Sequence, residues 1–211
     1  MKKTILLTVA TIILTALSAV GQLTARKAFT EAPAKIIPLL DRNTRLDMLD
    51  YFDAGIERAS DNALKGKSQI NSLSDNAISV KITDASTIDI IILPAGSDSL
   101  IAVINTVATP APDSKLTVYS RNWESNLTPS TFAKPALKDW LSAEGRKNSS
   151  EVESLVPFLL IGYSYNTSTA TLTLTNNTAS FLSPDIYTMV EPYLLPELKY
   201  NWNGRKFLPA K

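Results

Sequence analysis

The sequence predicts an α+β fold, in which antiparallel β-meanders form one or two sheets with helices packed on one side. Apolar residues recur at helical spacing up to residue 56, and from Gly66 onward they recur at every second position. The loops between consecutive expected strands are short. Parallel strands need a crossover of a dozen or more residues, so these loops favour antiparallel neighbours.

The first 21 residues have the pattern of a cleaved signal peptide. Two lysines precede an uncharged apolar run over residues 4–17, and the small residues Ala19 and Gly21 suit signal peptidase. We expect cleavage between Gly21 and Gln22. The run is shorter than the roughly 20 residues of a membrane-spanning helix. The sequence thus predicts an exported protein, periplasmic or extracellular, with no transmembrane segment after cleavage.

Two helices are expected in the next part of the chain. The first covers 24–40, has Thr24 as its N-cap and is interrupted by two prolines. The second is expected to be capped by Asn43 or Thr44. Its apolar face comprises Leu46, Leu49, Phe52 and Ile56. Charged residues near its start are interpreted as solvated: Asp41, Arg42, Arg45 and Asp47.

The first meander follows Gly66. Alternating apolar residues predict strands around residues 78–82, 88–93, 100–107 and 116–120. The strand at 88–93 is apolar on both faces, which indicates a central position in the sheet.

The second part of the sequence repeats this order loosely. A short helix is expected over 135–144 and another over 184–193. Strands 158–165 and 170–176 form one expected hairpin, and strands 198–202 and 205–208 form another around Asn203-Gly204, a two-residue turn signal. This recurrence suggests that the exported domain, 22–211, consists of two packed halves, 22–125 and 126–211.

The composition excludes several chemistries. The chain has no cysteine and no histidine, so it lacks disulfides, thiol nucleophiles, lipid-modified cysteines, imidazole ligands and a Ser-His-Asp triad. We therefore expect no metal and no cofactor. The 21 Lys+Arg and 20 Asp+Glu nearly balance, which argues against nucleic acid as a partner.

Catalytic candidates are few, and none is assigned. Gly66-Lys67-Ser68 resembles the end of a phosphate-binding loop, but Asp61 stands where the first glycine is required, so a turn is the better interpretation. Thr131 and Lys134 approach a hydroxyl–lysine dyad, but a connector is the favoured interpretation. Carboxylate pairs that could cleave glycosides would come from Asp47, Asp50, Asp53, Asp89, Glu151 and Glu153. Asp89 is unusual because it interrupts an apolar strand.

Aromatic residues near the C-terminus could form a stacking surface for a carbohydrate or peptide. Its candidate members are Tyr200, Trp202 and Arg205. Cross-strand hairpin packing is the favoured alternative. The threonine row at 171, 173 and 175 is interpreted as the solvated face of a strand.

Six segments of the chain carry a resemblance to a known family: Thr24 to Phe29, Ile37 to Leu40, Asn43 to Asp50, Leu64 to Ser68, Pro110 to Lys115 and Lys199 to Phe207. With these segments the chain resembles a family of exported, functionally uncharacterised proteins of Bacteroides-type bacteria. The resemblance implies an envelope location and brings no catalytic residues. In such bacteria Asp98-Ser99-Leu100 resembles an O-glycosylation signal at Ser99.

The sequence therefore favours a non-catalytic binding or interaction module of the periplasm or cell surface. Its expected partner is an envelope protein or a glycan. Two alternatives remain: a carboxylate-dependent glycan hydrolase, and a structural component of the envelope.

Overall fold

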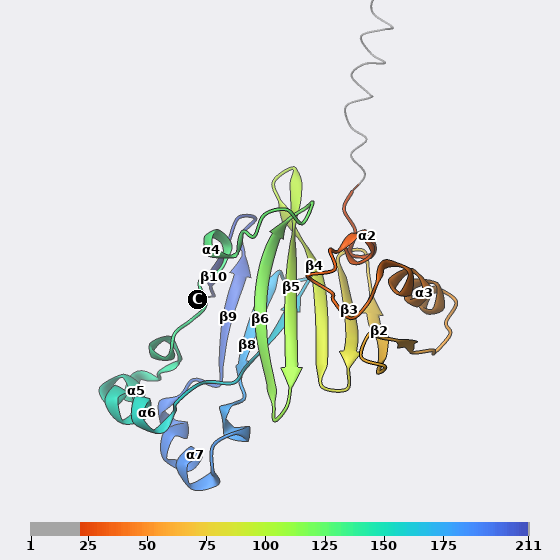
Figure 1. Ribbon diagram of the computed structural model, residues 1–211. Coiled ribbons are helices and arrows are strands. Elements are labelled where there is room, and N and C mark those ends of the chain that lie inside the picture. Colours follow the sequence, from red (N-terminus) through yellow and green to blue (C-terminus); the bar gives the residue numbers. More distant parts are fainter. Residues whose placement is uncertain (1–21, 211) are drawn as a thin grey trace, which may run out of the picture.

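The computed structural model describes residues 22–210, which form two antiparallel sheets and several short helices (Figure 1). The expected signal peptide, residues 1–21, lies outside the described residues, and the expected cleavage site is at their boundary. The first part contains α2 (Ala25–Glu31), α3 (Arg42–Asp53), β1 (Ser60–Asp61), β2 (Lys67–Leu73), β3 (Ala77–Thr83), β4 (Ser86–Ala95), β5 (Asp98–Ala108) and β6 (Pro112–Ser120). The second contains α4 (Thr128–Thr131), α5 (Ala143–Lys147), α6 (Ser149–Leu155), β7 (Ile161–Asn166), β8 (Thr171–Asn176), α7 (Pro184–Val190), β9 (Glu197–Trp202) and β10 (Phe207–Pro209), with short 3-10 helices at Leu137–Trp140, Thr178–Ser180 and Glu191–Tyr193.

The two sheets confirm the predicted α+β class. The first has the order β1-β2-β3-β4-β5-β6 and the second the order β10-β9-β8-β7. Every neighbouring pair is antiparallel. The strands predicted at 78–82, 88–93, 100–107 and 116–120 are β3, β4, β5 and β6. The suggested boundary at 125/126 falls between β6 and α4, so each sheet lies on one side of it.

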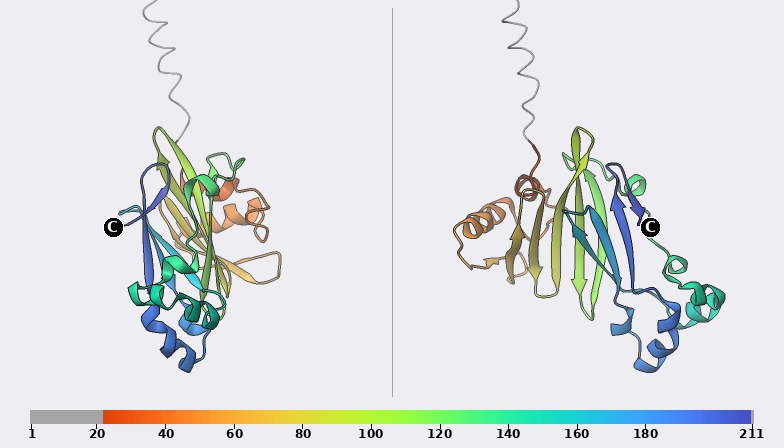
Figure 2. Two further views of the ribbon diagram at one scale, coloured as in Figure 1. Left: turned by 90° about the vertical axis from the view of Figure 1, so that its left-hand side faces the viewer. Right: turned by 180° about the vertical axis from the view of Figure 1, so that it is seen from behind.

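The first sheet is covered on both faces. Helices α2 and α3 lie on one face, and the second sheet lies behind the other face (Figure 2). On the helix side, Ile88, Ile90 and Ile92 of β4 join the core beneath α2 and α3. On the opposite side, Ile91 and Leu93 pack with residues of the second sheet. This arrangement confirms the central position predicted for β4.

Helix α2 begins where the sequence predicts and ends earlier. The Thr24 hydroxyl accepts a hydrogen bond from the backbone N–H of Lys27 at 3.2 Å, which caps the helix. The helix ends at Glu31, two residues before Pro33, because proline removes a backbone donor and restricts the residue before it. Ala28 and Phe29 are fully buried against the first sheet.

Helix α3 begins earlier than the sequence predicts. Asp41 is its N-cap, and the Asp41 carboxylate accepts a hydrogen bond from the N–H of Thr44 at 2.8 Å. The expected caps, Asn43 and Thr44, therefore lie in the first turn of the helix. The expected apolar face is also wrong at its end. Phe52 is 38% exposed, and Ile56, which lies beyond the end of α3, is 52% exposed, whereas Met48 and Leu49 are buried.

Arg45 corrects the prediction of solvated charge in this helix. Its side chain is 4% exposed, and its guanidinium donates hydrogen bonds to the carbonyls of Phe29 at 2.6 Å and Ala32 at 2.8 Å. The last carbonyls of a helix have no partner within it. Arg45 satisfies two such groups at the end of α2 and thereby joins the two helices.

The second part differs from the prediction in its helices and its last turn. The helix expected over 135–144 is a 3-10 turn at Leu137–Trp140 followed by α5, and α6 was not predicted. The last hairpin has a four-residue loop rather than a two-residue turn, since Trp202 pairs with Phe207. Gly204 has a φ of +88°, while the Asn203 side chain accepts the N–H groups of the two residues after Gly204.

Within residues 22–210, every helix is too short or too polar to span a bilayer. The longest is α3, with twelve residues.

Candidate functional site

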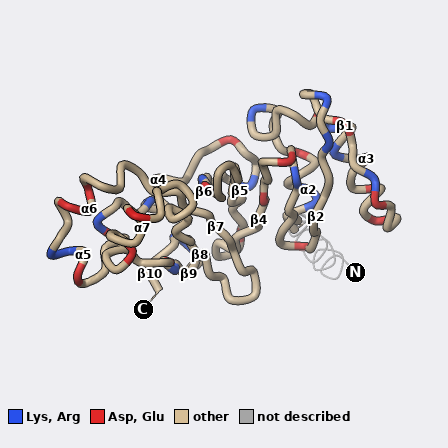
Figure 3. The backbone as a smooth tube through the Cα atoms, turned by 90° about the horizontal axis from the view of Figure 1, so that it is seen from below, with Lys and Arg blue, Asp and Glu red and all other residues tan. Residues whose placement is uncertain are grey.

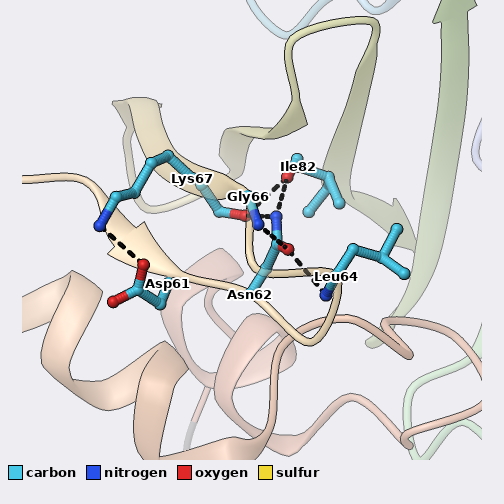
Figure 4. Close-up of polar contacts among 7 residues, drawn as sticks. Asp61, Asn62, Leu64, Gly66, Lys67 and Ile82 are labelled. Atoms are coloured by element: carbon cyan, nitrogen blue, oxygen red, sulfur yellow. Dashed lines mark hydrogen bonds and ion pairs between the residues drawn. The ribbon is translucent and has the colours of Figure 1, made fainter.

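The segment resembling a phosphate-binding loop is the connection between β1 and β2. Lys67 forms an ion pair with Asp61 at 2.7 Å (Figure 4). The Ser68 hydroxyl donates to the carbonyl of Ile82 at 2.6 Å. A strand follows Gly66, whereas a phosphate-binding loop leads into a helix. The structure confirms the interpretation as a turn.

Asn62 holds this turn in shape. Its side-chain oxygen accepts the N–H groups of Leu64 at 3.0 Å and Gly66 at 3.1 Å, and its amide donates to Ile82 at 2.9 Å (Figure 4). A methyl group on Gly66 would lie 3.3 Å from the Asn62 amide nitrogen. The loop is therefore a compact structural element whose polar groups are used internally.

The candidate carboxylates lie on three separate elements, β4, α3 and α6. Asp89 lies in β4 opposite Ser79 and Ile104, and burial raises the pKa of its carboxyl while a hydrogen bond from Ser79 opposes that shift. The other candidate acids are exposed on α3 and α6: Asp47, Asp50, Asp53, Glu151 and Glu153. Residues 22–210 contain no group of three or more acids that could hold a metal ion.

Two of the three residues of the possible aromatic surface pack into the core, and the third lies in a loop. Trp202 is 7% exposed and packs against Phe207, and Tyr200 is half-buried with its ring 5.6 Å from that of Phe132. Arg205 lies exposed in the last loop. The indole face of Trp202 is used in the core, as the hairpin-packing interpretation expects. The threonine row of β8 lies on the opposite, more exposed face, also as expected.

A cleft of about 590 Å³ lies where β6 and the second sheet diverge. Such a volume lies in the range of small-ligand sites. Its lining comes from β5, β6, the segment after β6 and β7: Asn105, Val107, Asp113, Ser114, Lys115, Leu116, Thr128, Phe132, Lys134 and Tyr163. Helix α4 contacts β6, and Figure 1 shows it next to β9 and β10 of the second sheet.

The cleft is open because β6 is an edge strand with different neighbours at its two ends. At its beginning, β7 approaches, and the Tyr163 N–H donates to the Ser114 hydroxyl at 3.0 Å. At its other end, the connector pairs with Val118, whose carbonyl accepts the Leu127 N–H at 2.7 Å and whose N–H donates to Thr128 at 2.9 Å. The middle of β6 faces the cleft.

The floor of the cleft is apolar and its rim is basic. Leu116, Phe132 and Tyr163 are buried, and the rings of Phe132 and Tyr163 meet edge to face at 6.1 Å. Lys115 and Lys134 are exposed, and neither forms an ion pair within the described part of the chain. Other charged residues gather largely on the helices at the two ends of the molecule (Figure 3).

Tyr163 contributes a neutral hydroxyl. Burial, together with the charge of Asp113 and the neighbouring Tyr200, raises the pKa of Tyr163 to about 12. Its phenol therefore stays protonated at physiological pH and can donate a hydrogen bond. The arrangement can accommodate an apolar group, a hydrogen-bond acceptor and a negative charge.

Sequence reasoning did not find this cleft. It predicted the strand at 116–120 and interpreted the segment around Thr131 and Lys134 as a connector. The available signal was the position of β6 as the last strand of the meander, because a terminal strand has one unpaired edge.

The fold and the cleft define a class: an α+β protein of two packed antiparallel sheets, with a ligand-sized cleft at the edge of the larger sheet. The chain belongs to the family of proteins of unknown function DUF3256, whose model matches residues 17–207. The expected membership of a functionally uncharacterised family is confirmed.

A solved structure, a domain of an uncharacterized protein from Porphyromonas gingivalis W83, has a similar fold. The TM-score is 0.72 at 22% identity, covering 87% of this chain and 98% of that one. No curated protein matches the sequence.

Proposed function

We propose that this protein is an exported, non-catalytic binding module of the bacterial envelope, with its ligand in the cleft beside β6. The ligand is amphipathic and carries an apolar group and a negative charge. The observation that carries this proposal is the apolar floor of Leu116, Phe132 and Tyr163 beneath two lysines that have no ion-pair partner within the described residues.

The chemistry of the cleft supports binding. Placing a leucine-sized group on the apolar floor contributes about 1.5–3 kcal/mol. Of the titratable groups, Tyr163 stays protonated and Asp113 accepts the Ile161 N–H at 3.0 Å. A phenol that stays protonated is not available as a general base near neutral pH.

Export is supported by the pattern of the amino-terminal 21 residues. The test is mass analysis of the protein from the envelope fraction of its native host. We expect a chain that begins at Gln22. An intact Met1, or recovery from the cytoplasmic fraction alone, would contradict export and leave the cleft to be tested separately.

The binding proposal can be tested with ANS, an anionic dye with an apolar ring system. We expect saturable binding to the native protein. The double variant Lys115→Glu/Lys134→Glu should bind ANS about 10-fold more weakly, equivalent to about 1.4 kcal/mol. Lys35→Glu is the matched control because Lys35 is exposed and does not line the cleft.

Equal ANS affinity in the double variant and the wild type would contradict a ligand site at the cleft. If the site is correct, fractions of an envelope extract that contain the ligand will displace ANS from the wild type. A structural envelope component with no ligand predicts no displacement by any fraction.

A further inference from the structure

The backbone of β6 points alternately toward β5 and toward the cleft. Both backbone groups of Val118 point away from β5, because they bond to Leu127 and Thr128. The carbonyl of Pro112 also points away, since it accepts the Asn177 amide at 2.7 Å. The pairing of β5 with β6 has no register shift between these positions. Alternation therefore directs the N–H and C=O groups of Ser114 and Leu116 outward.

These outward groups have no hydrogen-bond partner among residues 22–210, although the Ser114 hydroxyl itself accepts from Tyr163. The two residues are nevertheless buried, with 7% of Ser114 and 5% of Leu116 exposed. Buried backbone groups in native proteins are almost always paired with protein, water or ligand. The cleft thus presents a short stretch of strand edge that can accept another strand.

We infer that the ligand is an extended peptide segment that pairs with β6 at Leu116. This inference rests on the proposed function and names its ligand class. A peptide residue placed directly opposite Leu116 in an antiparallel pair exchanges two hydrogen bonds with it, one in each direction. The edge is blocked at Val118 by the connector and at Pro112 by Asn177, so the opening accommodates about three residues.

The two faces of β6 specify the side chains of this segment. Directly opposed residues lie on the same face, so the residue opposite Leu116 points toward Phe132 and Tyr163 and should be apolar. Its two neighbours point to the other face, on which Lys115 lies. They should be acidic, because one lies directly opposite Lys115 and the other lies diagonally from it, opposite Thr117. The sequence pattern is acidic–apolar–acidic.

The test uses fluorescently labelled peptides and the native protein, with affinity measured by anisotropy. The first peptide is acetyl-Ser-Glu-Leu-Glu-Ser-amide. The second, acetyl-Glu-Ser-Leu-Ser-Glu-amide, has the same composition but places both acids on the apolar face. The third carries an N-methyl group on the leucine of the first peptide, which removes the central N–H donor.

We expect the first peptide to bind, and the other two to bind at least about 10-fold more weakly. Lys115→Gln should weaken binding of the first peptide and reduce its salt dependence. Lys35→Gln should leave the affinity for the first peptide and the salt dependence of that affinity unchanged.

Equal affinity for the N-methylated peptide would overturn strand pairing. Equal affinity for the first and second peptides would overturn the assignment of apolar and acidic side chains to opposite faces of the bound strand. If no peptide binds while ANS binds in a manner that depends on Lys115 and Lys134, the peptide inference fails and the proposed function stands. If neither ligand binds, both fail.

Discussion

The indole N–H of Trp202 donates a hydrogen bond of 2.7 Å to the carbonyl oxygen of Pro94, a residue 108 positions away in the sequence. Trp202 lies at the end of β9 and Pro94 near the end of β4, so this bond joins the two sheets. It explains why an aromatic residue that the sequence offered for ligand stacking is instead buried. The ring also contacts Phe207 across the last hairpin, with centroids 5.0 Å apart.

Trp202→Phe should destabilise the protein by about 2 kcal/mol, because the Pro94 carbonyl loses its donor and the smaller ring leaves a void. Urea unfolding measures the change. Trp140→Phe is a useful control, since Trp140 is equally buried but its indole N–H forms no hydrogen bond with a described residue. An equal loss in both variants would mean that size alone matters.

Arg45→Met should cost about 2–4 kcal/mol, since two carbonyls at the end of α2 lose a charged donor in a buried site. Met keeps most of the packing volume, so the loss reports the hydrogen bonds. Arg42→Met on the same helix is exposed and should change the free energy of unfolding by less than about 0.5 kcal/mol. An unchanged midpoint for Arg45→Met would contradict the assigned role.

Asp89→Asn should raise the melting temperature at pH 7. Burial raises the pKa of Asp89 above its ordinary 3.8, so the ionised carboxylate disfavours the folded state. This penalty is complete above the folded pKa and disappears as the pH falls below the unfolded value. The advantage of the variant should therefore vanish near pH 3. A difference in melting temperature that is constant from pH 3 to pH 7 would contradict this assignment.

Gly145→Ala should be destabilising by about 1–3 kcal/mol, although alanine favours helices. A Cβ at position 145 of α5 would overlap the carbonyl oxygen of Tyr193, a backbone atom that cannot rotate away. Glu144→Ala, one residue earlier and exposed, is the control. Thermal unfolding distinguishes the two, and a Gly145→Ala protein as stable as the control would show that the backbones separate easily.

Ser99 remains a predicted site of O-glycosylation. It is the second residue of β5, partly exposed, directly after the tight turn in which Gly96 has a φ of +64°. Its N–H donates to the Asp98 carboxylate at 2.8 Å. We expect the intact mass of protein from the native host to exceed that of the unmodified chain, and the excess to disappear in Ser99→Ala. An unmodified mass would refute the prediction.

The class of fold and most of its strands follow from the spacing of apolar residues in the sequence. In β3, β4 and β5 apolar residues recur at every second position. This spacing identifies the buried face of each strand, because successive side chains of a strand point to opposite faces. The apolar residues on both faces of β4 placed it inside the sheet. The N-cap at Thr24 was also found, since capping depends on one side chain and the backbone N–H three residues later.

The burial of polar residues and the position of the cleft depend instead on contacts between distant segments of the chain. Arg45 has the sequence context of a solvated charge, and its burial depends on carbonyls 13 and 16 residues away. Phe52 and Ile56 continue an apolar spacing, yet both are exposed, in an open pocket beside Ile70 of β2. The cleft forms because β7 and the connector contact opposite ends of β6 and leave the outward backbone groups of Ser114 and Leu116 without a partner among the described residues. Local spacing carries no information on such long-range contacts, so the unpaired edge is defined only once both sheets are in place.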